Sequence, residues 1–99
     1  MMLNFVQDGS IVGEWELVEM DNLENKEKNT FENIYFEFKS DGTFITKENG
    51  NKIFGEYNVL KGVLHMESKE EAIIYRMEIQ HNQMHWYDNK GLKYILKKR

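Results

Sequence analysis

Histidine is the side chain that most often moves protons near neutral pH or binds metals, and the chain has three, His65, His81 and His85. His81 and His85 are four residues apart, which on a helix would put two ligands on one face. The surrounding pattern predicts a turn followed by a strand, where that shared face is lost. His65 and His85 fall on strands that are not adjacent, and no Asp or Glu completes a ligand set with them. The sequence therefore predicts no metal site.

Residues for covalent or acid–base catalysis are equally sparse. There are no cysteines, which excludes disulfides, cysteine-ligated zinc and thiol chemistry. Ser10, Ser40 and Ser68 lie in predicted turns, with no histidine spaced to activate them. The carboxylates occupy turn or outward positions, and the sequence has no glycine-rich phosphate loop. We expect a protein that is not an enzyme and uses no cofactor.

The composition narrows the class of protein further. Of the 99 residues, 40% are hydrophobic and 30% are charged, as in an ordinary soluble globular chain. Lys plus Arg number 13 and Asp plus Glu number 17, which gives a net charge of −4. A nucleic-acid partner is therefore not expected, because such proteins carry a basic face. No apolar run approaches the roughly 18 residues of a membrane-spanning helix.

Residues 1–10 carry no basic segment followed by a long apolar run, so we expect no secretion signal. As it stands, the sequence predicts a cytoplasmic protein. It predicts an exported one, periplasmic or lipid-anchored, if a leader has been removed. Met2, Leu3, Phe5 and Val6 make this segment more apolar than a free tail needs, and we expect it to cover one barrel mouth or to dock on a partner.

Alternation of apolar and polar side chains with a period of two runs through most of the chain, as in Ile34, Phe36 and Phe38. Asp–Gly, Asn–Gly and similar turn sequences separate the alternating runs. The pattern predicts eight strands, at residues 11–20, 31–39, 43–48, 52–60, 62–67, 71–80, 83–88 and 91–97. This spacing indicates an all-β meander, in a barrel or a sandwich. Residues 21–30 are expected to form a flexible loop, and a helix over residues 14–28 is the alternative there.

Four motifs follow one another along the chain: Gly13-Glu14-Trp15, Phe36-x-Phe38-x-x-Asp41-Gly42-Thr43-Phe44, Gly55-x-Tyr57 and Tyr94-x-Leu96-Lys97-Lys98. In this order they resemble the lipocalin-like (calycin) proteins, in particular the short bacterial ones, over residues 11–98. The resemblance implies an all-β fold, an eight-stranded antiparallel up-and-down barrel that is closed or nearly closed. Residues 1–10 would precede it as an N-terminal segment, and residues 11–99 would form a single barrel domain.

The resemblance also assigns roles at the start of the first strand. Gly13 would let the chain enter the barrel floor with no side chain in the way, and Trp15 would plug the narrow end. In lipocalins a basic side chain from the end of the last strand lies over this tryptophan, and Lys97 and Arg99 are the positions that match it. The chain departs from full-length lipocalins in being much shorter and in lacking their C-terminal helix.

The strand periods place large apolar side chains inside the barrel, and the resemblance implies that a small apolar or amphipathic ligand binds among them. Met66, Met77 and Met84 fall on three consecutive strands and would adapt their shape to such a ligand. The expected ligand-binding residues are Trp15, Phe36, Phe38, Phe44, Tyr57, Met66, Tyr75, Met77, Met84 and Trp86. The alternative is that they form only a hydrophobic core, together with the other inward positions, Leu17, Ile34, Val59, Leu64, Ile73, Tyr94 and Leu96.

A protein-binding barrel with a filled core is the alternative function. Residues 13–17 and the closing residues 96–98 also resemble the small bacterial metalloprotease inhibitors, eight-stranded barrels whose N-terminal segment enters the protease cleft. Residues 1–10 would then be the active part, although those inhibitors carry a disulfide and this chain has no cysteine. A third interpretation is a structural module of a larger assembly.

The outer surface is predicted to carry an apolar stripe. With the inward set fixed, Ile45, Phe54, Val63 and Ile74 point outward on four neighbouring strands. A contiguous stripe usually marks an interface, and we expect a homodimer or another protein partner to cover it. The alternative is a shift of one residue in the strand at 43–48, which would turn Ile45 inward and leave its neighbour Phe44 outside.

Charge is distributed unevenly along the chain. Residues 14–37 hold eight acids and two lysines, whereas residues 88–99 hold five basic residues and one acid. The first and last strands of a closed up-and-down barrel are neighbours. We therefore expect Glu14 and Glu16 to face Lys93 and Lys97 across the barrel seam.

Overall fold

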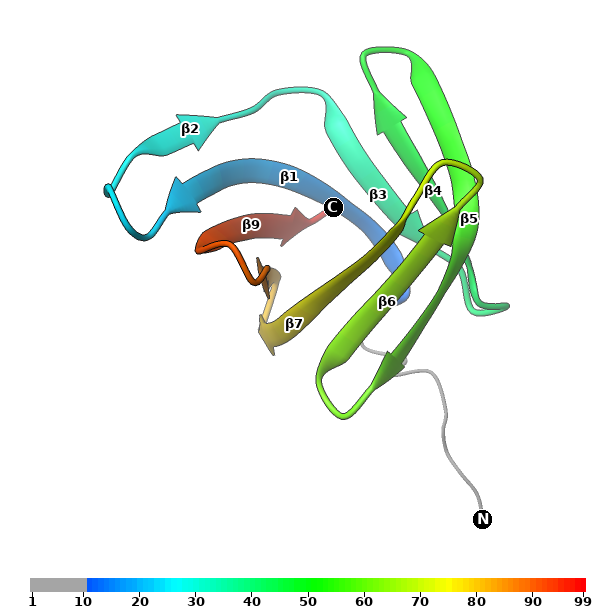
Figure 1. Cartoon of the computed structure of the whole chain (residues 1–99). Coiled ribbons are helices and arrows are strands. Elements are labelled where there is room, and N and C mark those ends of the chain that lie inside the picture. Colours follow the sequence, from blue (N-terminus) through cyan, green and yellow to red (C-terminus); the bar gives the residue numbers. More distant parts are fainter. Residues whose placement is uncertain (1–10) are drawn as a thin grey trace.

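The computed structural model describes residues 11–99, and the predictions made above for residues 1–10 lie outside them. The described residues form one antiparallel sheet that curls into a barrel (Figure 1). In chain order its strands are β1 (Gly13–Asn22), β2 (Lys28–Thr30), β3 (Ile34–Phe38), β4 (Thr43–Glu48), β5 (Asn51–Leu60), β6 (Val63–Ser68), β7 (Ala72–Gln80), β8 (Gln83–Tyr87) and β9 (Leu92–Lys98). Within residues 11–99 no helix is long and apolar enough to cross a membrane. The alternative of a helix over residues 14–28 is wrong, because most of that segment lies in β1.

Hydrogen bonding between the first and last strands closes the sheet. From β3 to β9 each strand pairs with the next one along the chain, while β1 pairs with β3 on one side and with β9 on the other. The strands β1 and β3 to β9 thus make a closed, eight-stranded antiparallel up-and-down barrel. The predicted fold class is confirmed.

The segment predicted as a loop, residues 21–30, is largely a hairpin. β1 continues to Asn22, and β2 runs back beside the second half of β1. The side chain of Asn22 accepts hydrogen bonds from the backbone N–H groups of Glu24 and Asn25, which fixes the turn. All three residues of β2 are exposed, so this strand has no alternation of apolar and polar side chains by which the sequence could predict it.

A β-bulge at Val18 divides β1 into two halves. The register with β9 shifts there, so that Leu17 lies opposite Leu96 and Met20 lies opposite Tyr94. Before the bulge β1 pairs with β3, and after it β1 pairs with β2. A bulge bends its strand, and β1 and β3 separate beyond this point (Figure 1).

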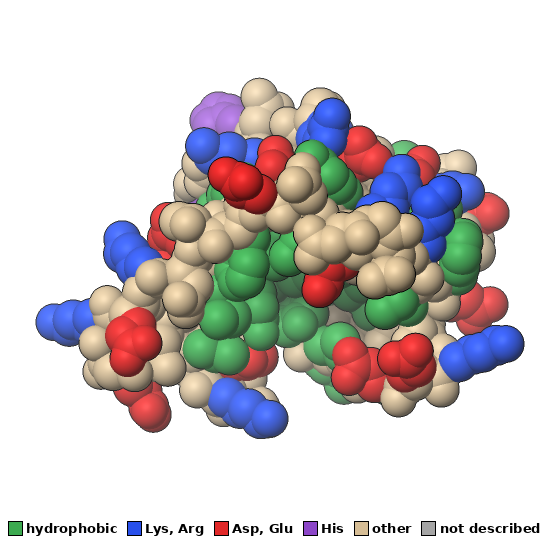
Figure 2. All heavy atoms as spheres, turned by 90° about the horizontal axis from the view of Figure 1, so that it is seen from above, with side chains coloured by type: hydrophobic (Ala, Val, Ile, Leu, Met, Phe, Trp, Pro, Cys, Tyr) green, Lys and Arg blue, Asp and Glu red, His purple; other side chains and the backbone are tan. Residues whose placement is uncertain are grey.

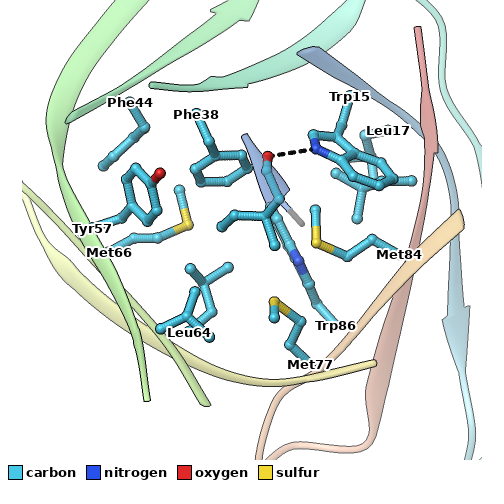
Figure 3. Packing of buried hydrophobic residues seen from close by; sticks show 13 residues of the cluster. Trp15, Leu17, Phe38, Phe44, Tyr57, Leu64, Met66, Met77, Met84 and Trp86 are labelled. Carbon is cyan, nitrogen blue, oxygen red and sulfur yellow. Dashed lines mark hydrogen bonds between the residues drawn. The ribbon is translucent and has the colours of Figure 1, made fainter. Parts of the chain in front are cut away.

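The inward positions of the strands form the hydrophobic core (Figure 3). Every residue predicted to face inward is buried or half-buried. Phe44 is only 4% exposed, so the alternative register of β4, with Phe44 outside, is wrong. Gly55 faces the interior beside it, and a Cβ there would collide with the Phe44 ring and with the carbonyl oxygen of Glu67. The absence of a side chain at Gly55 is therefore what lets the Phe44 ring lie against β5.

Trp15 is buried toward the end of the barrel where β1 begins, and it packs beside Leu17 and Met84 (Figure 3). Its indole Nε1 donates a hydrogen bond of 2.9 Å to the carbonyl of Ile11, a fully buried residue that the predicted inward set omits. Lys98 crosses the indole, with Nζ 5.0 Å from the ring centroid and 2.8 Å from the Val12 carbonyl that accepts its hydrogen bond. Gly13 has φ of 131°, and a Cβ there would come within 3.0 Å of the Lys98 side chain.

The basic residue over Trp15 differs from the two predicted positions, Lys97 and Arg99. Alternation along β9 explains the error, since Lys98 follows the buried Leu96 toward the interior whereas its two neighbours face outward. Arg99 instead lies over the Tyr35 ring on the outer face, 4.5 Å from its centroid.

The charges at the barrel seam are arranged partly as predicted. Glu16 lies opposite Lys97 in the register of β1 and β9. Glu14, however, forms ion pairs with Lys47 and Arg99, at 3.0 and 3.5 Å. The prediction that Glu14 or Glu16 faces Lys93 is wrong, because the antiparallel register that sets Glu16 opposite Lys97 sets Asp21 opposite Lys93. Such exposed ion pairs each contribute little stability, typically below about 1 kcal/mol.

Replacing Trp15 tests how much this side chain contributes to the stability of the barrel. We expect Trp15→Ala to lower the free energy of unfolding by about 3–5 kcal/mol, because it empties a large, fully buried site. Urea denaturation followed by circular dichroism measures the change, and Phe54→Ala, which removes an aromatic ring that is 62% exposed, is the control. A loss no larger than that of the control would contradict the role assigned to Trp15.

Candidate functional site

The interior of the barrel is closed at one end and open at the other. Near Trp15 the inward side chains, such as Leu64, Met84 and Leu96, are fully buried. Toward the opposite mouth, where β1 ends and β3 begins, the inward side chains are only half-buried. They are Ile34, Phe36, Ile73, Tyr75 and Tyr94. The barrel thus has a packed floor and an accessible apolar mouth.

A cavity of about 210 Å³ lies at this mouth, on the side formed by β3 to β7. Its wall is mainly apolar, and Phe44 and Met66 connect it to the core. The lining residues of the wall are Phe36, Phe44, Thr46, Ile53, Met66, Ile73 and Tyr75, and those of the rim are Glu48, Ser68, Glu70 and Glu71. Seen from above in Figure 2, apolar side chains line the hollow and acidic side chains stand at its edge. We call this space the mouth cavity.

Aromatic rings in contact with one another support one wall of the mouth cavity. Trp86 stacks on Tyr75, with centroids 4.9 Å apart and rings 15° from parallel. Phe36 meets Trp86 edge to face at the same distance, and Tyr94 meets Tyr75 at 5.3 Å. Contacts of this kind hold rings in fixed orientations, so the wall is formed before any ligand arrives. The buried Nε1 of Trp86 has no hydrogen-bond partner within the described residues.

The two phenols of this cluster resist ionisation. Burial is the main cause that raises the pKa of Tyr75, and Tyr94, Asp88 and Glu71 raise it further. Burial also raises the pKa of Tyr94, with a contribution from Asp88. Tyr75, which lines the mouth cavity, is a neutral phenol near pH 7, and a hydrogen bond with the Tyr94 hydroxyl contributes to its raised pKa.

Two solved structures resemble this barrel over nearly the whole chain. A lipocalin-like protein from Bacteroides uniformis superposes with a TM-score of 0.78 at 15% sequence identity, and the match covers 92% of this chain and 100% of that chain. An uncharacterized protein from Bacteroides eggerthii gives a TM-score of 0.77 at 15% identity, covering 90% and 99% of the two chains. The chain has the lipocalin-like fold. The resemblance predicted from its motifs is confirmed at the level of the fold.

Comparison by sequence adds nothing to this assignment. No protein-family model matches the sequence of this chain. No curated protein matches its sequence.

The residues predicted to bind a ligand divide into two groups in the lipocalin-like barrel. Phe36, Phe44, Met66 and Tyr75 line the mouth cavity. The other residues, Trp15, Phe38, Tyr57, Met77, Met84 and Trp86, are each at most 8% exposed and pack together beneath it.

The sequence prediction omits the rim of the mouth cavity and, in its wall, Thr46 and Ile53. Thr46 and Glu48 follow Phe44 at intervals of two residues on the same strand. This spacing could have predicted that both face the interior. Glu70 and Glu71 lie in the turn between β6 and β7, where alternation gives no information. Only the closed barrel brings this turn beside the end of β4.

The histidines stand apart from the mouth cavity. His65 and His85 lie on outward positions of β6 and β8, and His81 lies in the turn before β8. Burial and the nearby Lys93 lower the pKa of His85, and Gln83 is its hydrogen-bond partner at 3.2 Å. Within residues 11–99 no three His, Asp or Glu side chains come together in a way that would hold a metal ion.

The outward apolar residues form two patches rather than one stripe. Ile45 pairs across strands with Phe54, whereas Val63 and Ile74 lie diagonally adjacent on β6 and β7. A row of polar positions runs between the patches, in which Glu56 of β5 lies opposite Glu67 of β6. The predicted continuity of the stripe is therefore wrong. Phe54 and Ile74 are the most exposed members, at 62% and 60%.

The buried phenols predict a loss of stability at alkaline pH. Above about pH 10 the tyrosines of the unfolded chain ionise, whereas the folded state keeps Tyr75 neutral. Stability that is fully present below pH 10 is then lost progressively as the pH rises. We expect Tyr75→Phe to flatten this decline in the free energy of unfolding, measured by urea denaturation at a series of pH values. An identical decline in the variant and the parent would contradict the raised pKa.

Proposed function

We propose that this lipocalin-like barrel binds a small apolar or amphipathic molecule in the mouth cavity and is not an enzyme. The observation that carries the proposal is an apolar cavity that opens to solvent at one end and stands on a packed floor at the other. Phe36, Ile73 and Tyr75 offer a ligand two apolar side chains and one neutral phenol. Burying apolar ligand surface there contributes about 25 cal/mol per Å².

The volume of the mouth cavity limits the size of its ligand. Pockets for drug-sized molecules usually enclose about 300–1,000 Å³, and this one encloses about 210 Å³. A molecule with a single aromatic ring or a short alkyl chain fits that space better than a steroid or a long fatty acid. An affinity near millimolar is expected for so few atoms, at about 0.3–0.5 kcal/mol for each.

Titration with phenylethanol, a neutral single-ring molecule, tests the proposal. We expect it to shift the backbone amide NMR signals of Phe36, Ile73 and Tyr75, while signals near Trp15 stay in place. Ile73→Trp fills the mouth cavity with an indole and should abolish these shifts. Ile74→Trp is the matched control, because it adds the same ring to the neighbouring residue on the outer face.

Two results would contradict the proposed function. One is the absence of shifts up to the solubility of phenylethanol, and the other is equal binding by the Ile73→Trp and Ile74→Trp variants. Circular dichroism of both variants establishes that the barrel is folded before their binding is compared.

A protein-binding role is a second candidate, and the free edge of β7 favours it. β8 ends opposite Arg76, so residues 72–75 of β7 pair with β6 alone. The Met77 N–H donates a hydrogen bond to the Gly62 carbonyl. Because N–H and C=O groups alternate in direction along a strand, this bond shows which residues of β7 face β6. Ala72 and Ile74 are on the alternate positions, so their N–H and C=O groups point away from β6, toward an open groove of about 660 Å³.

We infer that a second copy of this chain pairs with that edge. Residues 72–75 carry no charge and no proline, which are the usual protections of an exposed strand edge. In an antiparallel pair around a two-fold axis, Ala72 of one copy stands opposite Ile74 of the other. Four backbone hydrogen bonds then form, and the exposed Ile74 side chains are covered. The patch of Val63 and Ile74 would be part of this homodimer interface, and Ile45 and Phe54 would lie outside it.

Sedimentation equilibrium at high protein concentration tests the dimer. We expect the parent to be dimeric and Ile74→Lys to weaken the association at least about tenfold, because charges are placed at the centre of the pair. Phe54→Lys, on the other patch, should leave the dimer intact. A parent that stays monomeric, or equal effects of the two substitutions, would contradict the edge pairing.

A further inference from the structure

Three carboxylates line the rim of the mouth cavity, and no lysine or arginine lines the cavity with them. Glu48 comes from the end of β4, and Glu70 and Glu71 come from the turn between β6 and β7. The side chains that line the cavity include no lysine and no arginine. Within residues 11–99 the ion pairs involve only Glu14 and Glu37 as acids. Lys69 lies in the same turn but does not line the cavity, so the side chains that do line it bring three negative charges and no positive one.

The turn that carries two of these carboxylates is held in place by its own hydrogen bonds. The Ser68 N–H donates to the Glu71 carbonyl at 2.9 Å, and the Ser68 hydroxyl accepts from the Glu70 N–H at 3.3 Å. The charge of Glu71 also reaches the cavity wall, since it contributes to the raised pKa of Tyr75. The apolar wall and the acidic rim thus act on the same small space.

We propose that the mouth cavity selects small amphiphiles that carry a protonated amine on an apolar ring or short chain. The ring would lie against Phe36 and Ile73, and the ammonium group would stay at the rim between Glu48 and the pair Glu70 and Glu71. An ammonium group at the rim keeps part of its hydration while it gains the attraction of three anions. The wall alone would accept neutral molecules, so the rim is what sets the class. This inference rests on the proposed function and makes it more specific.

Three molecules with one skeleton and different charge test the selection: phenethylamine, phenylethanol and phenylacetate. We expect phenethylamine to bind the full chain about tenfold more tightly than phenylethanol, and phenylacetate to bind more weakly than either, at low ionic strength. The advantage of the amine should shrink as salt is added, because exposed charges are screened. Amide NMR titration measures all three dissociation constants.

Two triple variants separate a local effect of the rim from the overall charge of the protein. The variant Glu48→Gln, Glu70→Gln and Glu71→Gln should lose the preference for the amine, so that its dissociation constants for phenethylamine and phenylethanol become similar. The control is Glu56→Gln, Glu67→Gln and Glu78→Gln, which removes the same charge from outward positions of β5, β6 and β7. It should keep the preference. Circular dichroism confirms that both variants are folded.

The outcomes distinguish this inference from the function on which it rests. Equal binding of phenethylamine and phenylethanol by the parent would overturn the selection of amines and leave the proposed function standing. So would a preference that survives in the rim variant or disappears in both variants. If none of the three molecules binds, the proposed function fails, and the inference fails with it.

Discussion

The pairing of β1 with β9 is the constraint on which the rest of the structure depends. Once the sheet closes, each strand has one side toward a shared interior, and alternate residues along every strand must fill it. Eight strands enclose a space that side chains nearly fill, so a few aromatic rings are enough to pack the floor. The short chain can therefore form a buried core without a helix to cover an open sheet.

The same closure explains why the barrel is packed at one end and open at the other. At the floor, Gly13 brings β1 close to Lys98, and Trp15 fills the space between the strands. Toward the mouth, the bulge at Val18 turns β1 away from β3, and β8 ends before it covers the first residues of β7. Fewer side chains then meet across the interior. The mouth cavity and the free edge of β7 both lie at this end, and both proposals about function begin there.

Stability and binding are assigned to different residues by this arrangement. Trp15, Leu64 and Leu96 are fully buried and stabilise the fold. Phe36 and Ile73 pack against that core and remain partly accessible to solvent. Trp86 connects the two groups, since it is buried in the core and stacks against Tyr75 in the cavity wall. A ligand at the mouth would thus meet a surface that is already formed, and would not have to open the core.

The sequence by itself determined the all-β class and most of the inward residues, because a period of two is a local property that each strand carries in its own side chains. It left two registers open for β4, and the burial of Phe44 decided between them. The resemblance carried by Gly13 and Trp15 also implied a buried Trp15 near the start of the first strand, and Trp15 is buried there. Local patterns carried no information about the hairpin of β2, whose residues are all exposed, or about the bulge at Val18, which shifts the pairs beyond Leu17 by one residue. Alternation along β9 puts Lys98 on the same side as Leu96, but only the closed barrel brought it over Trp15. Closure also decided that Glu71 joins Glu48 at one cavity, and that Glu56 and Glu67 divide the outer apolar residues. These are contacts between strands, and they follow from register and closure, which the order of residues within any one strand does not contain.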